Sequence, residues 1–236
     1  FRGELLAIGA TVWASPDGRA WSLRSLSGPR RAREDAEALV FRDQLVFVDP
    51  QSATVYISAD GADWSEQVEI VGFDRRCGAV IAALPSGRLI IAGGGDCAYG
   101  GFYTDVWVSD DARTWRQVID PATGQARTVP WVGRMWPCSV TTSPGGLWMV
   151  GGFRIDAGVG RNLSDVWTTA DGETWREVVA AGLGVEPRHA PTCYWREQAS
   201  ALYVVAGKSG ANGLNDNAAV LNDVNVLRLP LPEFLR

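Results

Sequence analysis

Short stretches of alternating apolar and polar residues, broken by glycine-rich turns, recur along the whole chain. In four of them, an apolar strand leads through an Asp-Gly or similar turn into a strand that opens with tryptophan. They are TVWASPDGRAW (11–21), TVYISADGADW (54–64), DVWVSDDARTW (105–115) and DVWTTADGETW (165–175). Alternation with period two indicates β-strands, and Asp-Gly between such strands indicates a hairpin in which both central turn residues need positive φ. The pattern therefore predicts four β-hairpins.

Each unit has further apolar segments ahead of its DVW-like strand, two in every unit except the first. The nearer one ends in Gly-Gly or Ala-Gly in GRLIIAGGG (87–95), GLWMVGGF (146–153) and ALYVVAGK (201–208), with degenerate versions in LLAIGA (5–10) and QLVFVDP (44–50). The earlier one is AEALVF (36–41), CGAVIAAL (77–84), CSVTTS (138–143) or CYWREQ (193–198). A unit of four strands that repeats every 40 to 60 residues or so is typical of propeller blades. We therefore predict an all-β fold, a β-propeller of about five four-stranded blades.

The blades divide the single domain 1–236 at about 1–30, 31–72, 73–125, 126–182 and 183–236. The ends are irregular, because the first unit begins at its second strand and the last has no tryptophan strand after DVNVLRLP (223–230). Either a short blade closes the ring, or the ring is incomplete or part of a larger one. Five blades are the favoured interpretation.

Composition and charge narrow the range of partners. The chain has a formal net charge of −5 and a sequence pI near 5.0, which gives no electrostatic footprint for nucleic acid. It has no apolar run long enough for a membrane span. The basic residues include a single lysine, Lys208, which suggests the arginine-rich coding bias of a GC-rich, bacterial genome.

The cysteines Cys77, Cys97, Cys138 and Cys193 include no C-x-x-C pair, so we expect neither a metal site nor a cofactor. Their even number favours a secreted or periplasmic protein with one or two disulfides, and buried free thiols are the alternative. We favour a bridge between Cys77 and Cys97, which belong to one blade. We expect inner strands of different blades to lie too far apart for the roughly 7 Å between Cα atoms that a disulfide tolerates.

Two families resemble this pattern. The Gly-Gly, the DVW and the later tryptophan resemble kelch repeats, and the S-x-D-G-x-x-W hairpins resemble the Asp box, or BNR repeat, of sialidases and sortilin-type propellers. The hairpins are one residue shorter than the usual Asp box, and Asp111-Ala112 lacks the glycine. The resemblance implies that these boxes are structural turns and not catalytic groups.

The topology of a four-stranded blade places the longest connections on one face. They follow the Gly-Gly strands at 95–104, 154–164 and 209–222, and they join blades at 119–136 and 180–189. Because loops on a rigid scaffold carry binding residues, we expect the ligand on this face.

Candidate ligand-binding residues lie on the same face. They are Arg76, Arg134, Arg188, Trp131, Trp136, Tyr99, Tyr103 and His189. The arginines precede successive inner strands, where kelch repeats often carry one. They are candidates either to hold a carboxylate or phosphate or to bond loop carbonyls. The aromatic residues are candidates for stacking on a sugar or peptide or for packing between blades.

The single histidine, His189, argues against a copper oxidase and against most nucleophile–histidine triads. The leading interpretation is a non-catalytic propeller that binds a protein or carbohydrate ligand. The alternative is a sugar-acid-processing enzyme, sialidase-like or a kelch-type epimerase. It would combine the three arginines with Tyr99 or Tyr103 and one of Glu37, Asp74 or Asp96. A third interpretation is a fragment of a larger assembly.

Overall fold

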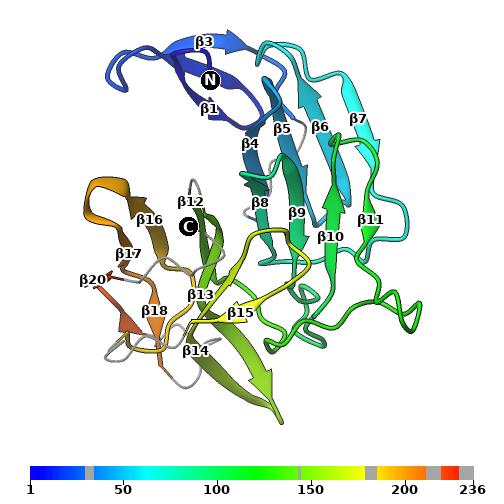
Figure 1. Cartoon of the computed structure of the whole chain (residues 1–236). Coiled ribbons are helices and arrows are strands. Elements are labelled where there is room, and N and C mark those ends of the chain that lie inside the picture. The colour runs from blue at the N-terminus through cyan, green and yellow to red at the C-terminus, as the bar shows by residue number, and fades with distance from the viewer. Residues whose placement is uncertain (30–34, 143–144, 179–184, 211–218, 229–236) are drawn as a thin grey trace. The chain divides into compact units, whose positions relative to one another are not determined.

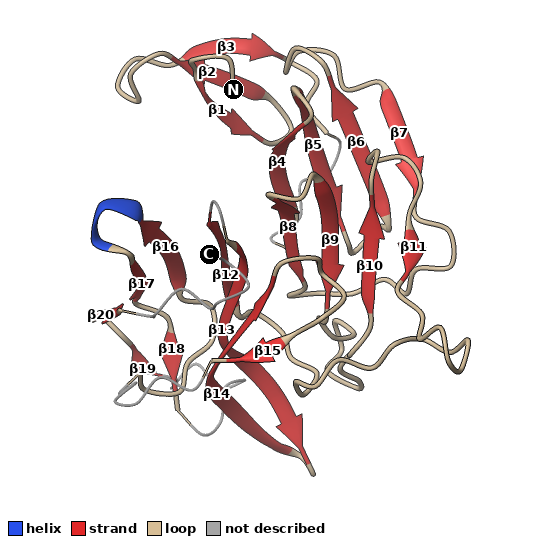
Figure 2. Ribbon diagram, viewed as in Figure 1, coloured by secondary structure: helices blue, strands red, loops and turns tan. Residues whose placement is uncertain are grey.

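A computed structural model describes residues 1–29, 35–142, 145–178, 185–210 and 219–228 (Figure 1). The prediction of an all-β propeller is confirmed, since the strands form successive antiparallel sheets and the only helical turn in these ranges is η1 (Glu197–Ala199) (Figure 2). No helix in the described ranges is long and apolar enough to cross a membrane. The chain forms two compact units: 1–75 with 109–115, and 76–108 with 116–236.

The first unit holds two sheets. One has the order β1 (Leu5–Ile8), β2 (Val12–Ser15) and β3 (Ser22–Ser25). The other has the order β4 (Glu37–Phe41), β5 (Gln44–Asp49), β6 (Thr54–Ser58) and β7 (Glu66–Glu69). The buried core contains Val12, Leu45, Phe47 and Tyr56 from the strands and Trp64 from the turn before β7. Val46 and Val48, on the other face of β5, are buried as well, so this strand is covered on both sides.

The second unit holds three larger sheets and a short ribbon. The first sheet contains β8 (Val80–Leu84), β9 (Arg88–Ala92), β10 (Val106–Ser109) and β11 (Arg116–Gln117). The second contains β12 (Cys138–Thr142), β13 (Gly146–Asp156), β14 (Val159–Thr169) and β15 (Arg176–Glu177). The third contains β16 (Thr192–Arg196), β17 (Ala201–Val205) and β20 (Val224–Leu227), and the ribbon pairs β18 (Lys208–Ser209) with β19 (Ala219–Val220).

The four predicted hairpin turns share one geometry that differs in detail from the prediction. Positive φ is confined to the residue after the aspartate, for example 77° at Gly61 and 66° at Ala112. The aspartate instead accepts backbone hydrogen bonds: Asp60 Oδ1 accepts from the N–H groups of Ala62 (2.8 Å) and Asp63 (3.0 Å). The aspartate carboxylate therefore holds the turn together through backbone hydrogen bonds, and only one residue of the turn is left-handed.

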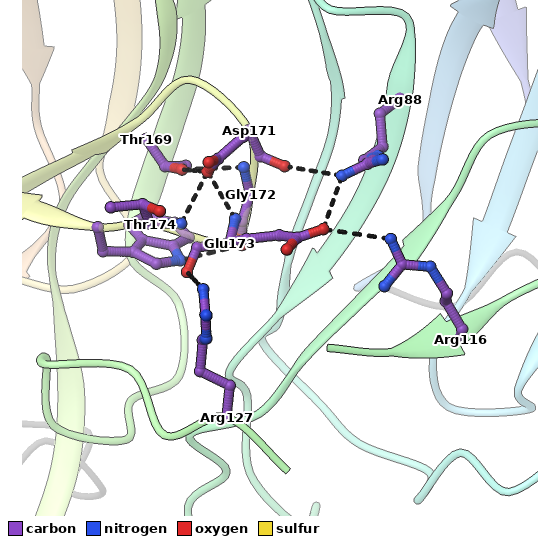
Figure 3. A network of polar contacts seen from close by, with 9 residues as sticks. Arg88, Arg116, Arg127, Thr169, Asp171, Gly172, Glu173 and Thr174 are labelled. Carbon is purple, nitrogen blue, oxygen red and sulfur yellow. Dashed lines mark hydrogen bonds and ion pairs between the residues drawn. The ribbon is translucent and has the colours of Figure 1, made fainter. Parts of the chain in front are cut away.

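The turn between β14 and β15 also ties two neighbouring sheets of the second unit together (Figure 3). Glu173 in this turn accepts hydrogen bonds from Arg88 on β9 (2.9 Å) and Arg116 on β11 (3.2 Å). Arg127 donates to the Glu173 carbonyl oxygen at 3.4 Å. The charged residues of the turn therefore face the previous sheet, which agrees with a structural role.

Two disulfides are present, and one of them corrects an expectation. Cys77 and Cys97 are bonded, with Cα atoms 5.2 Å apart. Cys138 on β12 and Cys193 on β16 are also bonded, at 5.6 Å, although they belong to different blades. The expectation that inner strands of different blades lie too far apart was wrong, because β12 and β16 are direct neighbours.

Segment 154–164 is not a loop. The strands β13 and β14 have 11 residues each and stay paired as far as Asp156 and Val159, with the turn at Ala157 and Gly158 (Figure 2). Alternating residues of the insertion continue the ladder beyond a register shift between Val150 and Gly152. The result is a hairpin that extends the blade. Parts of the segments 180–189 and 209–222 lie outside the described residues.

Candidate ligand-binding face

The three predicted arginines occupy equivalent positions, each within its own blade. Arg134 donates to both carboxylate oxygens of Asp165 (2.6 and 2.8 Å) and to the carbonyl oxygen of Gly151 (2.9 Å). Arg76 makes the same set of contacts with Asp105 and Gly93, and Arg188 with Asp223 and Ala206. The arginine side chains are at most 1% exposed. Their donors are therefore engaged within the protein.

We call each of these arginines, together with its aspartate and carbonyl partners, an arginine clamp. The aspartates of the clamps are charged at neutral pH. Burial raises the pKa of Asp165, but the hydrogen bonds and the charge of Arg134 outweigh it and hold the pKa below its usual range. The same balance lowers the pKa of Asp105, and the hydrogen bond from Arg188 is the main cause for Asp223. Each aspartate opens a DVW or DVN motif, which marks its position in the sequence but not its pairing with an arginine.

The predicted aromatic residues occupy three different environments. Trp131 is 2% exposed and packs edge-on against Trp175 with ring centroids 5.4 Å apart, so it belongs to the core. Tyr103 lies against the guanidinium group of Arg76, 4.0 Å from ring centroid to Cζ. Tyr99, Trp136 and His189 come together, which the sequence could not show.

These three residues and Phe153 form an aromatic cluster at the ends of three blades. Trp136 contacts Tyr99 (ring centroids 5.9 Å apart), Phe153 (6.3 Å) and His189 (5.9 Å). Tyr99 comes from the connection between β9 and β10, Phe153 from β13, and the other two from segments that precede β12 and β16. Sequence reasoning missed Phe153, which is fully buried and reads as an ordinary strand residue.

The backbone at Trp136 is unusual. Its φ is +51°, and the corresponding residues two positions after Arg76 and Arg188 are Gly78 (+63°) and Ala190 (+50°). The N–H of Trp136 donates to the Gly78 carbonyl oxygen (2.9 Å), and the Trp136 carbonyl oxygen accepts from Ala190 (2.8 Å). Hydrogen bonds between blades therefore enforce the left-handed conformation, which costs a bulky residue about 1–3 kcal/mol.

His189 is buried and hydrogen-bonded to Asn162 on β14, with Nδ1 2.7 Å from Oδ1. Because the Asn162 amide group donates to the Gly210 carbonyl oxygen, its Oδ1 is the acceptor and His189 Nδ1 carries the proton. Burial, and then the charge of Lys208, lower the pKa of His189 to about 4. The imidazole is therefore neutral at physiological pH, and Nε2 is an acceptor.

A groove of about 420 Å³ lies beside this pair. It is lined by Val159, Gly160, Arg161, Asn162, Glu186, Pro187 and Gly210. These residues come from three of the five segments that the sequence places on one face, namely 154–164, 180–189 and 209–222. Individual groove residues were missed, because the extended hairpin that presents most of them looked like a loop.

The groove offers mixed chemistry but few reactive groups. Arg161 and Glu186 are exposed, and Asn162 supplies an amide. Among the lining residues that the structure describes, Glu186 is the single carboxylate. The described part of the chain contains no cluster of three or more His, Cys, Asp or Glu side chains that could hold a metal ion.

Two solved structures share this fold. The chain is similar to YjhT, with 11% identity and a TM-score of 0.64 over 98% of this chain and 80% of YjhT. It is also similar to a mutant of the alpha-L-arabinofuranosidase Arb93A from Fusarium graminearum in complex with an iminosugar inhibitor. Here the identity is 16% and the TM-score 0.51, over 95% of this chain and 70% of the enzyme. No protein-family model and no curated protein matches the sequence.

Proposed function

We propose that the protein is a non-catalytic propeller that binds a carbohydrate in the groove beside Asn162. The observation that carries this proposal is the groove itself. Its walls come from three segments that lie far apart in the sequence, 154–164, 180–189 and 209–222. Its volume lies in the range of small-ligand sites, and its position agrees with the placement of binding residues on the connections of rigid scaffolds.

The chemistry of the groove supports binding without turnover. Glycoside hydrolysis generally requires two carboxyl groups on opposite sides of the scissile bond, and the described lining supplies Glu186 alone. The sugar-acid-processing alternative relied on Arg76, Arg134 and Arg188, whose donors are engaged by aspartates and carbonyl oxygens. Neither observation favours an enzyme.

Two observations support a carbohydrate as the ligand. Apolar surface at Val159 and Pro187 lies beside the polar groups of Arg161, Asn162 and Glu186, and sugars offer C–H and hydroxyl groups in the same molecule. The similar arabinofuranosidase structure holds an iminosugar, which is support by analogy of fold. The two disulfides further support a secreted or periplasmic location for such a binder.

A glycan array of pyranose and furanose oligosaccharides tests this proposal. Arg161→Ala should weaken retention on the array about tenfold, since it removes a charged hydrogen-bond donor from the groove. Arg19→Ala is the matched control, because Arg19 is also exposed but lies on the turn between β2 and β3. The proposal fails if no carbohydrate is retained, or if both variants lose binding equally. Capture of a protein ligand instead would replace it.

A further inference from the structure

Trp136 occupies a position where the backbone conformation favours a small residue. The same site is Gly78 in one blade and Ala190 in another, and all three residues have a left-handed backbone. Their backbone groups form one chain of hydrogen bonds, from Trp136 N–H to the Gly78 carbonyl and from Ala190 N–H to the Trp136 carbonyl. The left-handed conformation is therefore repeated in all three blades, whereas the side chain at this position differs from blade to blade.

Tryptophan is a costly choice at this point, because left-handed backbone disfavours bulky residues. A Cβ atom added to Gly78 would lie 2.8 Å from both Met135 Cβ and the Trp136 backbone nitrogen and 2.9 Å from Trp136 Cδ1, so the segment at Trp136 requires glycine in the neighbouring blade. The indole remains partly exposed, unlike Trp131 and Trp148 in the cores. Strained residues that a structure retains concentrate at functional sites, and Trp136 stays partly exposed although it packs against Phe153 and His189.

Trp136 is also joined to the groove. Its ring contacts His189 (centroids 5.9 Å apart), and His189 is hydrogen-bonded to Asn162, which lines the groove. Tyr99 meets the indole edge-on at 5.9 Å and fixes its orientation. Trp136 is not among the residues that line the groove, but only His189 stands between its ring and Asn162.

We infer that Trp136 is the stacking platform of the binding site and that the ligand is a pyranose whose ring hydroxyls are equatorial. This inference rests on the proposed function. A pyranose of this kind has flat faces of C–H groups that pack against an indole, while its hydroxyls reach the polar groups of the groove. A furanose ring presents a smaller and less regular C–H face, so we expect it to bind less tightly.

Calorimetric titration with cellotriose and with arabinotriose tests this inference. The wild-type protein should bind cellotriose more tightly, and Trp136→Gly should weaken that binding about tenfold. Glycine suits the left-handed backbone, as it does at Gly78, so the variant should keep its fold. The control is Tyr194→Ala, which removes an exposed aromatic residue from β16 and should leave the affinity unchanged.

A second measurement needs no variant. Saturation-transfer NMR on the wild-type protein with cellotriose should give the strongest transfer to ring C–H protons after irradiation of the aromatic protons. Unchanged affinity in Trp136→Gly, while Arg161→Ala still weakens binding, overturns the inference and leaves the proposed function standing. Tighter binding of arabinotriose overturns the ligand class. If the wild-type protein binds no carbohydrate, the proposed function fails and the inference fails with it.

Discussion

The hairpin tryptophans allow a matched test of how burial, and not the turn motif, sets their contribution to stability. Trp64 and Trp21 close the same kind of turn in the first unit, and each donates its indole N–H to the carbonyl oxygen of the turn glycine (3.2 and 3.3 Å). Trp64 is 6% exposed and belongs to the core, whereas Trp21 is 42% exposed. Replacement by alanine removes the same hydrogen bond from both turns.

The expected difference follows from the buried area. Trp64→Ala should lower the free energy of unfolding by about 3–5 kcal/mol, as for other buried tryptophans. An indole buries about 200 Å², and apolar burial contributes about 25 cal/mol per Å², so the difference in exposed fraction makes Trp21→Ala milder by about 2 kcal/mol.

Urea denaturation, combined with hydrogen exchange of the β5 and β6 amides, measures both variants in the same unit. The urea dependence of the unfolding free energy should stay unchanged, which would show that the surface exposed on unfolding is the same. Equal losses from the two variants, or a larger loss from Trp21→Ala, would show that the turn contact and not burial determines the contribution. The reasoning from exposed area would then be refuted.

Two further predictions concern charged groups. Asp165→Asn leaves the buried Arg134 without a counter-charge, so urea denaturation should show a loss of about 3 kcal/mol, whereas Asp43→Asn in the exposed pair with Arg2 should cost less than about 1 kcal/mol. Similar losses in both would contradict the buried clamp. The pKa of His189 is lowered in the folded protein. As the pH falls below the ordinary value of 6.5, the imidazole is therefore protonated in the unfolded state before it is protonated in the folded state. The contribution of His189 to stability should therefore fall as the pH drops from 6.5 to about 4, by roughly 3 kcal/mol, and this contribution should level off below that. His189→Gln should remove this slope, and a slope that persists in the variant would assign it to other groups.

The strands and turns were predictable because their signals are local. Short apolar runs bounded by turn residues mark β5 and β6, and the aspartate at each turn is visible in the sequence together with the tryptophan that follows. The segments that build the groove also followed from topology, since connections of one kind lie at one end of a blade.

The contacts that define the site were not predictable, because they join residues far apart in the chain. Arg134 precedes Asp165 by a whole hairpin, and no short pattern shows that the two side chains pair. The Cys138–Cys193 bond depends on the spacing of neighbouring inner strands. The left-handed backbone at Trp136 comes from hydrogen bonds between blades, so tertiary structure overrides the residue's own preference.

The arginine clamp has a consequence for how much the connections of this scaffold can vary in length and sequence. Arg134 bonds Gly151 and Asp165, which stand at the two ends of the extended hairpin, and Arg188 does the same for Ala206 and Asp223. A guanidinium group therefore closes the base of each connection whatever its length. Because the entropy cost of lengthening a closed loop grows slowly, we expect insertions between the clamped ends to leave the blade below intact. We therefore expect this face to accept grafted loops.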